Sequence, residues 1–318
     1  MMFGTIAYLL GSSIRQGIPL LFGATGEILT EKGGHLNLGI PGIMYVGGIS
    51  GIIGGYLYEH FCANPNPALC ILIPLLATVI GSGLMALIFS FLTVTLRANQ
   101  NVTGLTLTTF GIGIGNFFGA SLLSFFGDSG SISLLTIGKW YKATPIPGLD
   151  FGFLAYLAVI IAILVSFYLN RTRAGLNMRA VGENPATADA AGINVTKYQY
   201  LSTIIGGIIA GLGGLYWVMD YTGGTWTNNG FGDRGWLAIA IVIFALWKPV
   251  LGIFCSFLFG GLYICCILIP GLSSAAKELI TMAPYVVTIL VLIITSIKNK
   301  RENQPPAHLG LNYFREDR

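Results

Sequence analysis

Eight long apolar runs constrain this chain more than any other feature of its sequence. They lie near residues 5–29, 38–58, 69–95, 102–126, 149–169, 198–219, 249–269 and 279–297. A helix needs about 20 apolar residues to cross the hydrocarbon core of a bilayer. Because backbone groups in lipid must be hydrogen-bonded within the protein, runs of this length predict membrane-spanning helices.

The composition agrees with a helical membrane protein. Hydrophobic residues make up 54% of the chain and charged residues only 9%, whereas a soluble domain has about 25% charged residues. The 44 glycines would let helices approach closely in lipid. We therefore expect an all-α polytopic protein with one transmembrane domain over residues 1–298 and no separate enzyme domain. Residues 299–318 should form a flexible cytoplasmic tail.

A ninth, shorter apolar run, Leu237–Trp247, could cross with help from its flanks or re-enter without crossing. If it counts as a span, twelve of the 17 basic residues lie on the side of the 170–197 loop and five on the other side. Basic residues concentrate on the cytoplasmic side of membrane proteins. The sequence thus predicts about nine transmembrane helices in the cell membrane, an external N-terminus and a cytoplasmic C-terminus.

The segment Met178–Asn194 is a polar island between two apolar runs. Asn184 is a good N-cap, Pro185 suits the first helical position, and Gly192 suits the left-handed residue that ends a helix. Glu183 would lie beside the positive end of the helix dipole. The pattern predicts a short helix with small side chains, on which a partner outside the bilayer could dock. An ordinary surface helix is the alternative.

Uncharged polar residues lie within the apolar runs. In the fourth run, Thr106, Thr109 and Asn116 share one helix face. They could bond a neutral polar solute, or equally a neighbouring helix or their own backbone. Asn37 opens the second run after a glycine-rich stretch and is a further candidate for the solute path. Ion-driven carriers usually place carboxylates or histidines at mid-membrane, and their scarcity here argues against that class.

The expected external loops carry aromatic residues and cysteines. Lys139–Lys142 lies in one loop and Trp226 in another; these residues suit an interfacial aromatic belt or a docking surface for an external partner. Cys62 and Cys70 could form a disulfide in an oxidising compartment, or Cys70 could begin the next helix. No spacing of these residue types indicates a metal site, and no catalytic or ATP-hydrolysing motif is found.

Several stretches resemble motifs of one transporter family. GEILTEKGGHLNLGIPGIM, from Gly26, resembles a block in the permease subunits of nucleoside ABC importers, which belong to the branched-chain amino acid and ribose permease superfamily. VGENPATADAAGIN, from Val181, resembles the segment that forms their coupling helix, and the stretch that begins at Asp233 resembles a third block. The sequence departs from the family pattern at Pro41, where an acidic residue is common.

The resemblance implies a type II ABC importer permease in which two four-span halves, spans 1–4 and 6–9, are related by inverted topology. The coupling helix, at about residues 183–194, would dock on the ATPase. The residues implied to couple to the ATPase are Arg179, Glu183, Asn184, Pro185, Ala188 and Gly192. The candidates for the solute path stay Asn37, Thr106, Thr109 and Asn116.

The implied function is inward transport of a neutral polar solute, above all a nucleoside, by alternating access. A pentose or other sugar, or a branched-chain amino acid, is the alternative solute, and a stand-alone secondary carrier is the alternative mechanism. The implied partners are a cytoplasmic ABC ATPase, a second homologous permease subunit and an extracellular lipid-anchored solute-binding protein. ATP would be used by the ATPase, so the chain itself is expected to hold no cofactor, to be no enzyme and to bind no nucleic acid polymer.

Overall fold

The structure, a computed structural model, describes residues 2–126, 131–134, 151–268, 273–298 and 304–316. Within these ranges the regular secondary structure is helical, and the described residues form no strand beyond an isolated bridge between Ser133 and Thr225. The prediction of an all-α protein is confirmed for this part of the chain.

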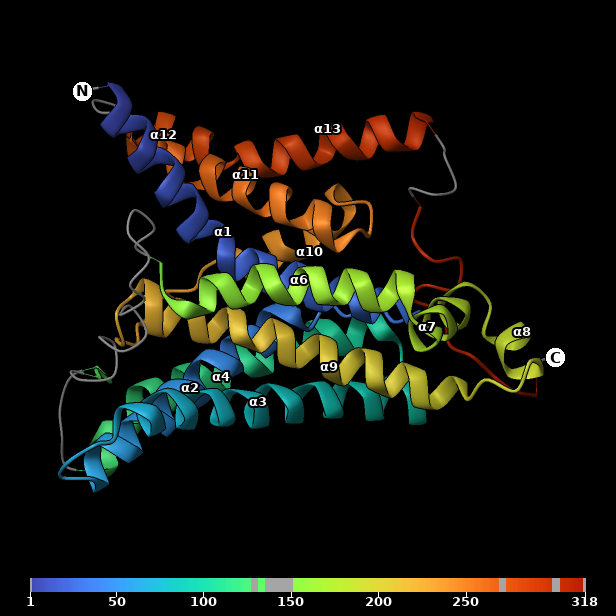
Figure 1. Cartoon of the computed structure of the whole chain (residues 1–318), viewed down its shortest axis with the longest axis horizontal. Helices are drawn as coiled ribbons and strands as arrows, with labels where there is room; N and C mark the ends of the chain where they lie inside the picture. Colours follow the sequence, from blue (N-terminus) through green and yellow to red (C-terminus); the bar gives the residue numbers. More distant parts are fainter. Residues whose placement is uncertain (1, 127–130, 135–150, 269–272, 299–303, 317–318) are drawn as a thin grey trace.

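The long helices follow the apolar runs of the sequence, and Figure 1 shows how all the helices are arranged. In chain order they are α1 (Met2–Lys32), α2 (Ile40–Phe61), α3 (Pro67–Ser90), α4 (Gln100–Phe125), α6 (Phe153–Arg171), α7 (Arg173–Glu183), α8 (Pro185–Ala190), α9 (Val195–Tyr216), α10 (Arg234–Phe244), α11 (Pro249–Leu268), α12 (Ser274–Thr281) and α13 (Ala283–Lys298). Short π-helical turns extend α3 over Phe91–Thr95 and α9 over Trp217–Tyr221.

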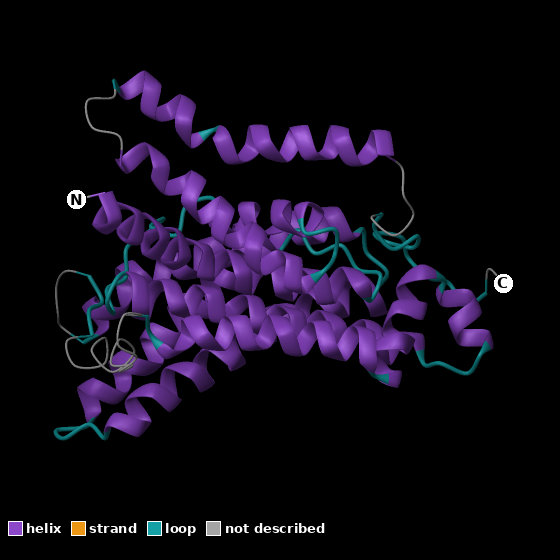
Figure 2. Cartoon of the chain, turned by 45° about the horizontal axis from the view of Figure 1, so that its top comes forward, coloured by secondary structure: helices purple, strands orange, loops and turns teal. Residues whose placement is uncertain are grey.

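The bundle has two ends that differ in content. α7, α8 and the C-terminus lie at one end, which we call the α8 end, and the N-terminus lies at the opposite end (Figure 1). The loop between α1 and α2 belongs to the α8 end, because Gly34 lies against Gly182 of α7. Figure 2 shows that helices make up most of the molecule and that loops gather mainly toward its ends.

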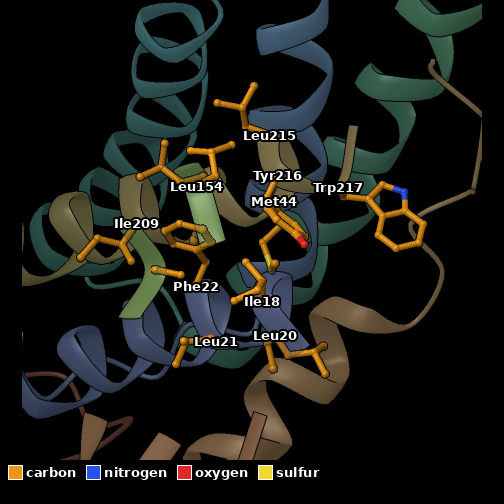
Figure 3. Packing of buried hydrophobic residues seen from close by; sticks show 14 of the residues in the cluster. Ile18, Leu20, Leu21, Phe22, Met44, Leu154, Ile209, Leu215, Tyr216 and Trp217 are labelled. Carbon is orange, nitrogen blue, oxygen red and sulfur yellow. The ribbon is translucent and has the colours of Figure 1, made fainter. Parts of the chain in front are cut away.

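The core forms around α1 and α9. Buried side chains of α1, among them Ile18, Leu21 and Phe22, pack with Met44 of α2 and Tyr216 of α9 in one hydrophobic cluster (Figure 3). Since α1 also packs against α10 and α11, its second half, from Gln16 onward, is enclosed by the other helices.

Glycines bring α2 and α9 into backbone contact. A Cβ atom added to Gly214 would lie 1.8 Å from the carbonyl oxygen of Met44, and one added to Gly47 would lie 2.5 Å from that of Gly211. No side chain larger than hydrogen fits at such separations. The glycine content noted in the sequence therefore has a structural role at this crossing.

Among the described residues, five helices are long and apolar enough to cross a membrane: α2, α3 with its π-helical turn, α4, α6, and α9 with its π-helical turn. Shorter apolar helices occupy Arg234–Phe244, Pro249–Ile264 and Ala283–Ile293. The sequence therefore predicted the multi-span architecture, while the count of nine stays a prediction. α10 has 11 residues and so rises about 16 Å, roughly half of the hydrocarbon core of about 30 Å.

Of the two interpretations of the cysteines, the structure agrees with the one in which Cys70 belongs to the next helix and forms no disulfide with Cys62. Cys62 and Cys70 are both free thiols, and Cys70 is buried within α3, which begins at Pro67. Asn66 caps this helix, because its side chain accepts a hydrogen bond from the backbone of Ala68 at 3.0 Å.

Candidate functional site

α8 is a short helix with well-defined caps at the end of the bundle. The side-chain oxygen of Asn184 accepts a hydrogen bond from the backbone N–H of Thr187 at 2.9 Å, and Pro185 occupies the first helical position. Gly192 follows the helix with φ of +81°, the left-handed conformation that glycine adopts without strain. The predicted caps are therefore confirmed. They could be predicted from the sequence because each cap depends on neighbouring residues alone.

The residues predicted to couple to an ATPase lie on different sides of this helix. Glu183, Asn184 and Gly192 are exposed, whereas Pro185 and Ala188 form its buried underside. Ala188 packs against two valines, of α7 and of the first turn of α9. Apart from Arg179, the predicted residues thus lie together on and beside α8, and a small-residue face is left open at the α8 end.

Arg179 lies one turn before the end of α7 and faces away from α8. It lines a cavity of about 150 Å³ together with Lys32 and Lys248. Three cations thus surround one small space between α1, α7 and the turn that follows α10.

The last described stretch, residues 304–316, folds onto α7 and α8; we call it the C-terminal segment. The N–H of His308 donates to the carbonyl oxygen of Gly182 at 3.1 Å, and the N–H of Ala307 donates to the Glu183 carboxylate at 3.3 Å. Asp189 of α8 receives both the Tyr313 hydroxyl, at 2.9 Å, and the Arg315 guanidinium, at 3.1 Å. Over its described part, this stretch thus lies against α7 and α8, and the expectation of a flexible cytoplasmic tail stays a prediction.

Asn37, a predicted solute-path residue, is fully buried in a turn at the α8 end. Its N–H donates to the Glu27 carboxylate at 2.8 Å, and its side-chain oxygen accepts from the N–H of Gly39 at 2.9 Å. Nearby, the indole N–H of Trp247 donates to the Glu31 carboxylate. This polar network joins α1, the α1–α2 loop and the turn after α10.

The other predicted path residues lie elsewhere. Thr106 and Thr109 are on the exposed face of α4, and the Thr109 hydroxyl donates to the carbonyl oxygen of its own helix, on Leu105, at 3.2 Å. Asn116 lies nearer the opposite end, where its side chain bonds Tyr45 at 2.6 Å. Within one chain the four predicted residues do not form a common cavity, so their role in a solute path stays a prediction.

A cavity of about 400 Å³ opens at the opposite end of the bundle. Aromatic, hydroxyl and charged side chains share its wall. Its lining residues are Tyr8, Ser12 and Arg15 of α1, Tyr216, Asp220 and Tyr221 at the end of α9, and Ile264 of α11. Sequence reasoning missed this site, although Asp220 was visible as one of the few ionisable residues at the end of a span.

A buried arginine supports the wall of this cavity. The guanidinium of Arg234 lies 3.7 Å from the ring centroid of Trp217 and donates to the carbonyl oxygen of Phe231 at 2.7 Å. It also bonds the side-chain oxygen of Gln16, whose amide donates to the Tyr221 hydroxyl at 2.6 Å. A cation held by an aromatic face and by neutral acceptors therefore fixes a cavity residue in place.

The aromatic loop after α9 folds inward. Trp226 is buried, its indole N–H donates to Asn228 at 2.9 Å, and its ring meets Tyr45 of α2 edge-on at 5.1 Å. Trp226 thus joins this loop to α2, which neither the belt nor the docking interpretation anticipated. The stretch Lys139–Lys142 of the other loop lies outside the described residues.

Comparison with known proteins identifies relatives over nearly the whole chain. The family model described as branched-chain amino acid transport system / permease component matches residues 9–295. The chain is 31% identical to a nucleoside ABC transporter permease, NupC of Lactococcus lactis, over 91% of this chain and 92% of that protein. It is 28% identical to a guanosine ABC transporter permease, NupQ of Bacillus subtilis, over 90% and 91%.

A third relative bears a different solute in its name. The chain is 32% identical to the "Putative glucose ABC transporter permease protein" of Haloferax volcanii, over 80% of this chain and 75% of that protein. No solved structure matches the chain. The matching family consists of transporter permeases and is not a family of enzymes.

Proposed function

Because the chain belongs to the family of branched-chain amino acid transport system permease components, we propose that it is the permease subunit of an ABC importer for nucleosides. Membership of this family and the apolar helices make it a multi-pass membrane protein. The observation that carries the proposal is α8, a capped helix with exposed small residues at one end of the bundle. Two relatives with nucleosides or guanosine in their names support the choice of solute.

The proposed topology has nine crossings, with the α8 end in the cytoplasm. Its shortest span, α10, is supported by contacts along α1: Arg234, which begins α10, bonds Gln16, and Trp247, just after α10, bonds Glu31. A helix rises about 22 Å between residues 16 and 31. α10 and the turn after it together thus cover most of the membrane thickness. The inverted relation of spans 1–4 to spans 6–9 is part of the proposal and rests on the resemblance.

In the proposed mechanism the chain supplies conformations and a partner supplies energy. A cytoplasmic ATPase binds α8 and uses the ATP; a second homologous permease completes the path; a lipid-anchored solute-binding protein delivers solute outside. Movement of α8 shifts the population between outward-facing and inward-facing states. The chain needs no catalytic residue for this role.

We propose the 400 Å³ cavity as the external entrance for the solute. Ligand pockets have about 300–1,000 Å³, with apolar walls and a few placed polar groups. The ring of Tyr221 can lie against a nucleobase, and the Asp220 carboxylate can accept hydrogen bonds from ribose hydroxyls. A sugar without a base would use the second contact and not the first.

The test is uptake of radiolabelled guanosine in cells that carry the chain with its neighbouring transport genes, against cells deleted for this chain alone. We expect deletion to abolish uptake, and excess unlabelled nucleoside but not ribose to compete. Tyr221→Ala should impair guanosine uptake more than Tyr221→Phe. If guanosine uptake survives deletion while sugar uptake is lost, the permease transports a sugar, as the glucose-named relative suggests.

A stand-alone carrier is separated from this proposal by reconstitution. Liposomes that contain the purified chain without any ATPase should not accumulate nucleoside, and accumulation there would contradict an ABC mechanism.

A further inference from the structure

The C-terminal segment touches three parts of the bundle besides α7. It reaches α8 through Asp189, as described above, and the α1–α2 loop through a hydrogen bond from the N–H of Gly310 to the carbonyl oxygen of Gly34 at 3.3 Å. It reaches the connection between α3 and α4 as well. There the Asn312 amide donates to the carbonyl oxygen of Arg97 at 2.7 Å, and Gln100 donates to that of Leu311 at 3.3 Å.

The Arg97 side chain completes this attachment. Its guanidinium lies 4.6 Å from the ring centroid of Phe314, a separation at which cation and aromatic face attract each other. Arg97 also has φ of +54°, a conformation that costs a non-glycine residue free energy. The contacts of the C-terminal segment therefore hold the α3–α4 connection in one conformation.

These contacts change what α8 is connected to. Along the chain α8 is joined only to α7 and α9. Through Asp189, the C-terminal segment joins it also to the ends of α1, α2, α3 and α4. A displacement of α8 would therefore disturb contacts to the first four helices of the bundle, and not only those to its sequence neighbours.

The C-terminal segment also shapes the surface beside α8. A cleft of about 680 Å³ lies between it, the α8–α9 turn and the α3–α4 connection. Arg97, Lys197 and Arg315 line this cleft, and the acidic residue among its lining, Asp189, is already engaged by Tyr313 and Arg315. Its net charge is positive.

Two large apolar side chains of the C-terminal segment remain exposed outside the membrane-spanning helices. Leu311 is 56% exposed and Phe314 is 38% exposed. The wall of the cleft itself includes three apolar residues, Val94, Ile193 and Val195, and apolar surface beside a functional element is typical of protein interfaces.

We propose that the C-terminal segment and α8 form one composite docking surface, and that its cleft receives an ATPase segment with acidic and apolar side chains. The inference rests on the proposed function, since it names the surface by which the permease meets its ATPase. Charge complementarity and continuity with the exposed face of α8 select this occupant. The attachment to four helices explains how such docking acts on the membrane domain.

The experiment uses the full transporter, coexpressed with the ABC ATPase from the neighbouring gene and purified through a tag on the second permease. One variant ends before Gln304, and another carries Arg315→Glu; Glu316→Gln, next to it and exposed, is the matched control. We expect the amount of ATPase that copurifies per permease to fall at least about fivefold in both variants relative to wild type. Both variants should also hydrolyse more ATP for each nucleoside transported. The control should match wild type.

Hydrogen exchange provides a measurement that does not depend on the solute. The amides of His308 and Gly310, which donate to Gly182 and Gly34, should be protected in the wild-type complex. If the shortened chain does not accumulate in cells, the result for Arg315→Glu alone tests the inference. ATPase retention and coupling unchanged by Arg315→Glu overturn the inference, whereas a wild-type permease that retains no ABC ATPase overturns the proposed function itself.

Discussion

The conformation of the α1–α2 loop depends on the carboxylate of one residue, Glu27. It is fully buried and accepts the N–H of Asn37 at 2.8 Å. Glu27→Ala should leave that N–H buried without an acceptor, at a cost of about 1–3 kcal/mol. Glu27→Gln keeps an acceptor of the same size and should be milder. Thermal unfolding of the purified variants is the measurement, and equal midpoints for the two would contradict this role.

Substitutions at Gly192 can separate the effect of backbone strain on stability from the effect of a blocked partner on transport. A Cβ atom at this position meets nothing within 4 Å in the chain, but φ of +81° strains any L side chain, by about 1–2 kcal/mol for alanine. Gly192→Ala and Gly192→Trp should therefore be about equally stable, whereas Gly192→Trp alone should block ATPase docking and uptake. Gly192→Asn, which tolerates this conformation, is the control. Normal transport by Gly192→Trp would contradict docking at α8.

At this scale the sequence predicts local interactions well and distant ones poorly. The caps of α8 were correct because Asn184 bonds an N–H three residues away. The sequence did not predict which threonine of α4 contacts another element. Thr108 does so, by donating to the carbonyl oxygen of Leu38 at 2.7 Å, whereas the predicted residues were Thr106 and Thr109. Periodicity indicates which residues share a face, but not which face meets the neighbouring helix.

The crossing of α2 and α9 requires glycine where the two helices meet. Gly214→Ala would place a methyl group 1.8 Å from the Met44 carbonyl oxygen, so the two helices would have to separate. We expect loss of stability and of uptake. Gly113→Ala in α4 is the control, because a Cβ atom there meets nothing within 4 Å and alanine favours a helix over glycine by about 1 kcal/mol. If Gly214→Ala unfolds at the same temperature as Gly113→Ala, the helices do not meet as described.

Helices were predictable to within a few residues where the apolar run was long, as for α2 and α9. α10 was ambiguous because its length falls short of a span, and its course is fixed by partners at both ends, Gln16 and Glu31 of α1. Such partners are invisible in a hydropathy pattern. The cavity at the opposite end was missed for the same reason, since its walls come from three helices far apart in sequence.

For the molecule as a whole, acid should loosen the C-terminal segment. Burial lowers the pKa of His35 to about 4, with nearby His308 contributing, and burial also lowers the pKa of His308. An unfolded histidine titrates near about 6.5, so the unfolded form binds more protons between these values. The stability these groups contribute is thus fully present above about pH 6.5 and is lost as the pH falls toward 4.

Hydrogen exchange of residues 306–315, corrected for intrinsic rates, measures this effect. Protection should fall between pH 7 and pH 5, and His308→Gln should weaken the dependence. His60→Gln, at the opposite end of the bundle, should not change it. Protection that stays constant over this range would contradict the burial of these imidazoles.

The topology can be tested with thiol labelling in intact cells. Cys62 follows α2 at the end opposite α8 and should react with a membrane-impermeant maleimide from outside. Glu316→Cys, made in a Cys62→Ser background, should react only after the cells are permeabilised. Labelling of Glu316→Cys in intact cells would place the α8 end outside and contradict the proposed orientation.

The bond between Tyr313 and Asp189 joins residues 124 positions apart, and α9 to α13 lie between them. Helices of a membrane protein are synthesised in chain order, N-terminal first. α8 can form as soon as its own caps emerge, but the composite surface is complete only after every later helix has been inserted and the chain has returned to α8. If the proposed surface is where the ATPase docks, a half-inserted permease fails to recruit it, and recruitment of the ATPase then reports that biogenesis is finished.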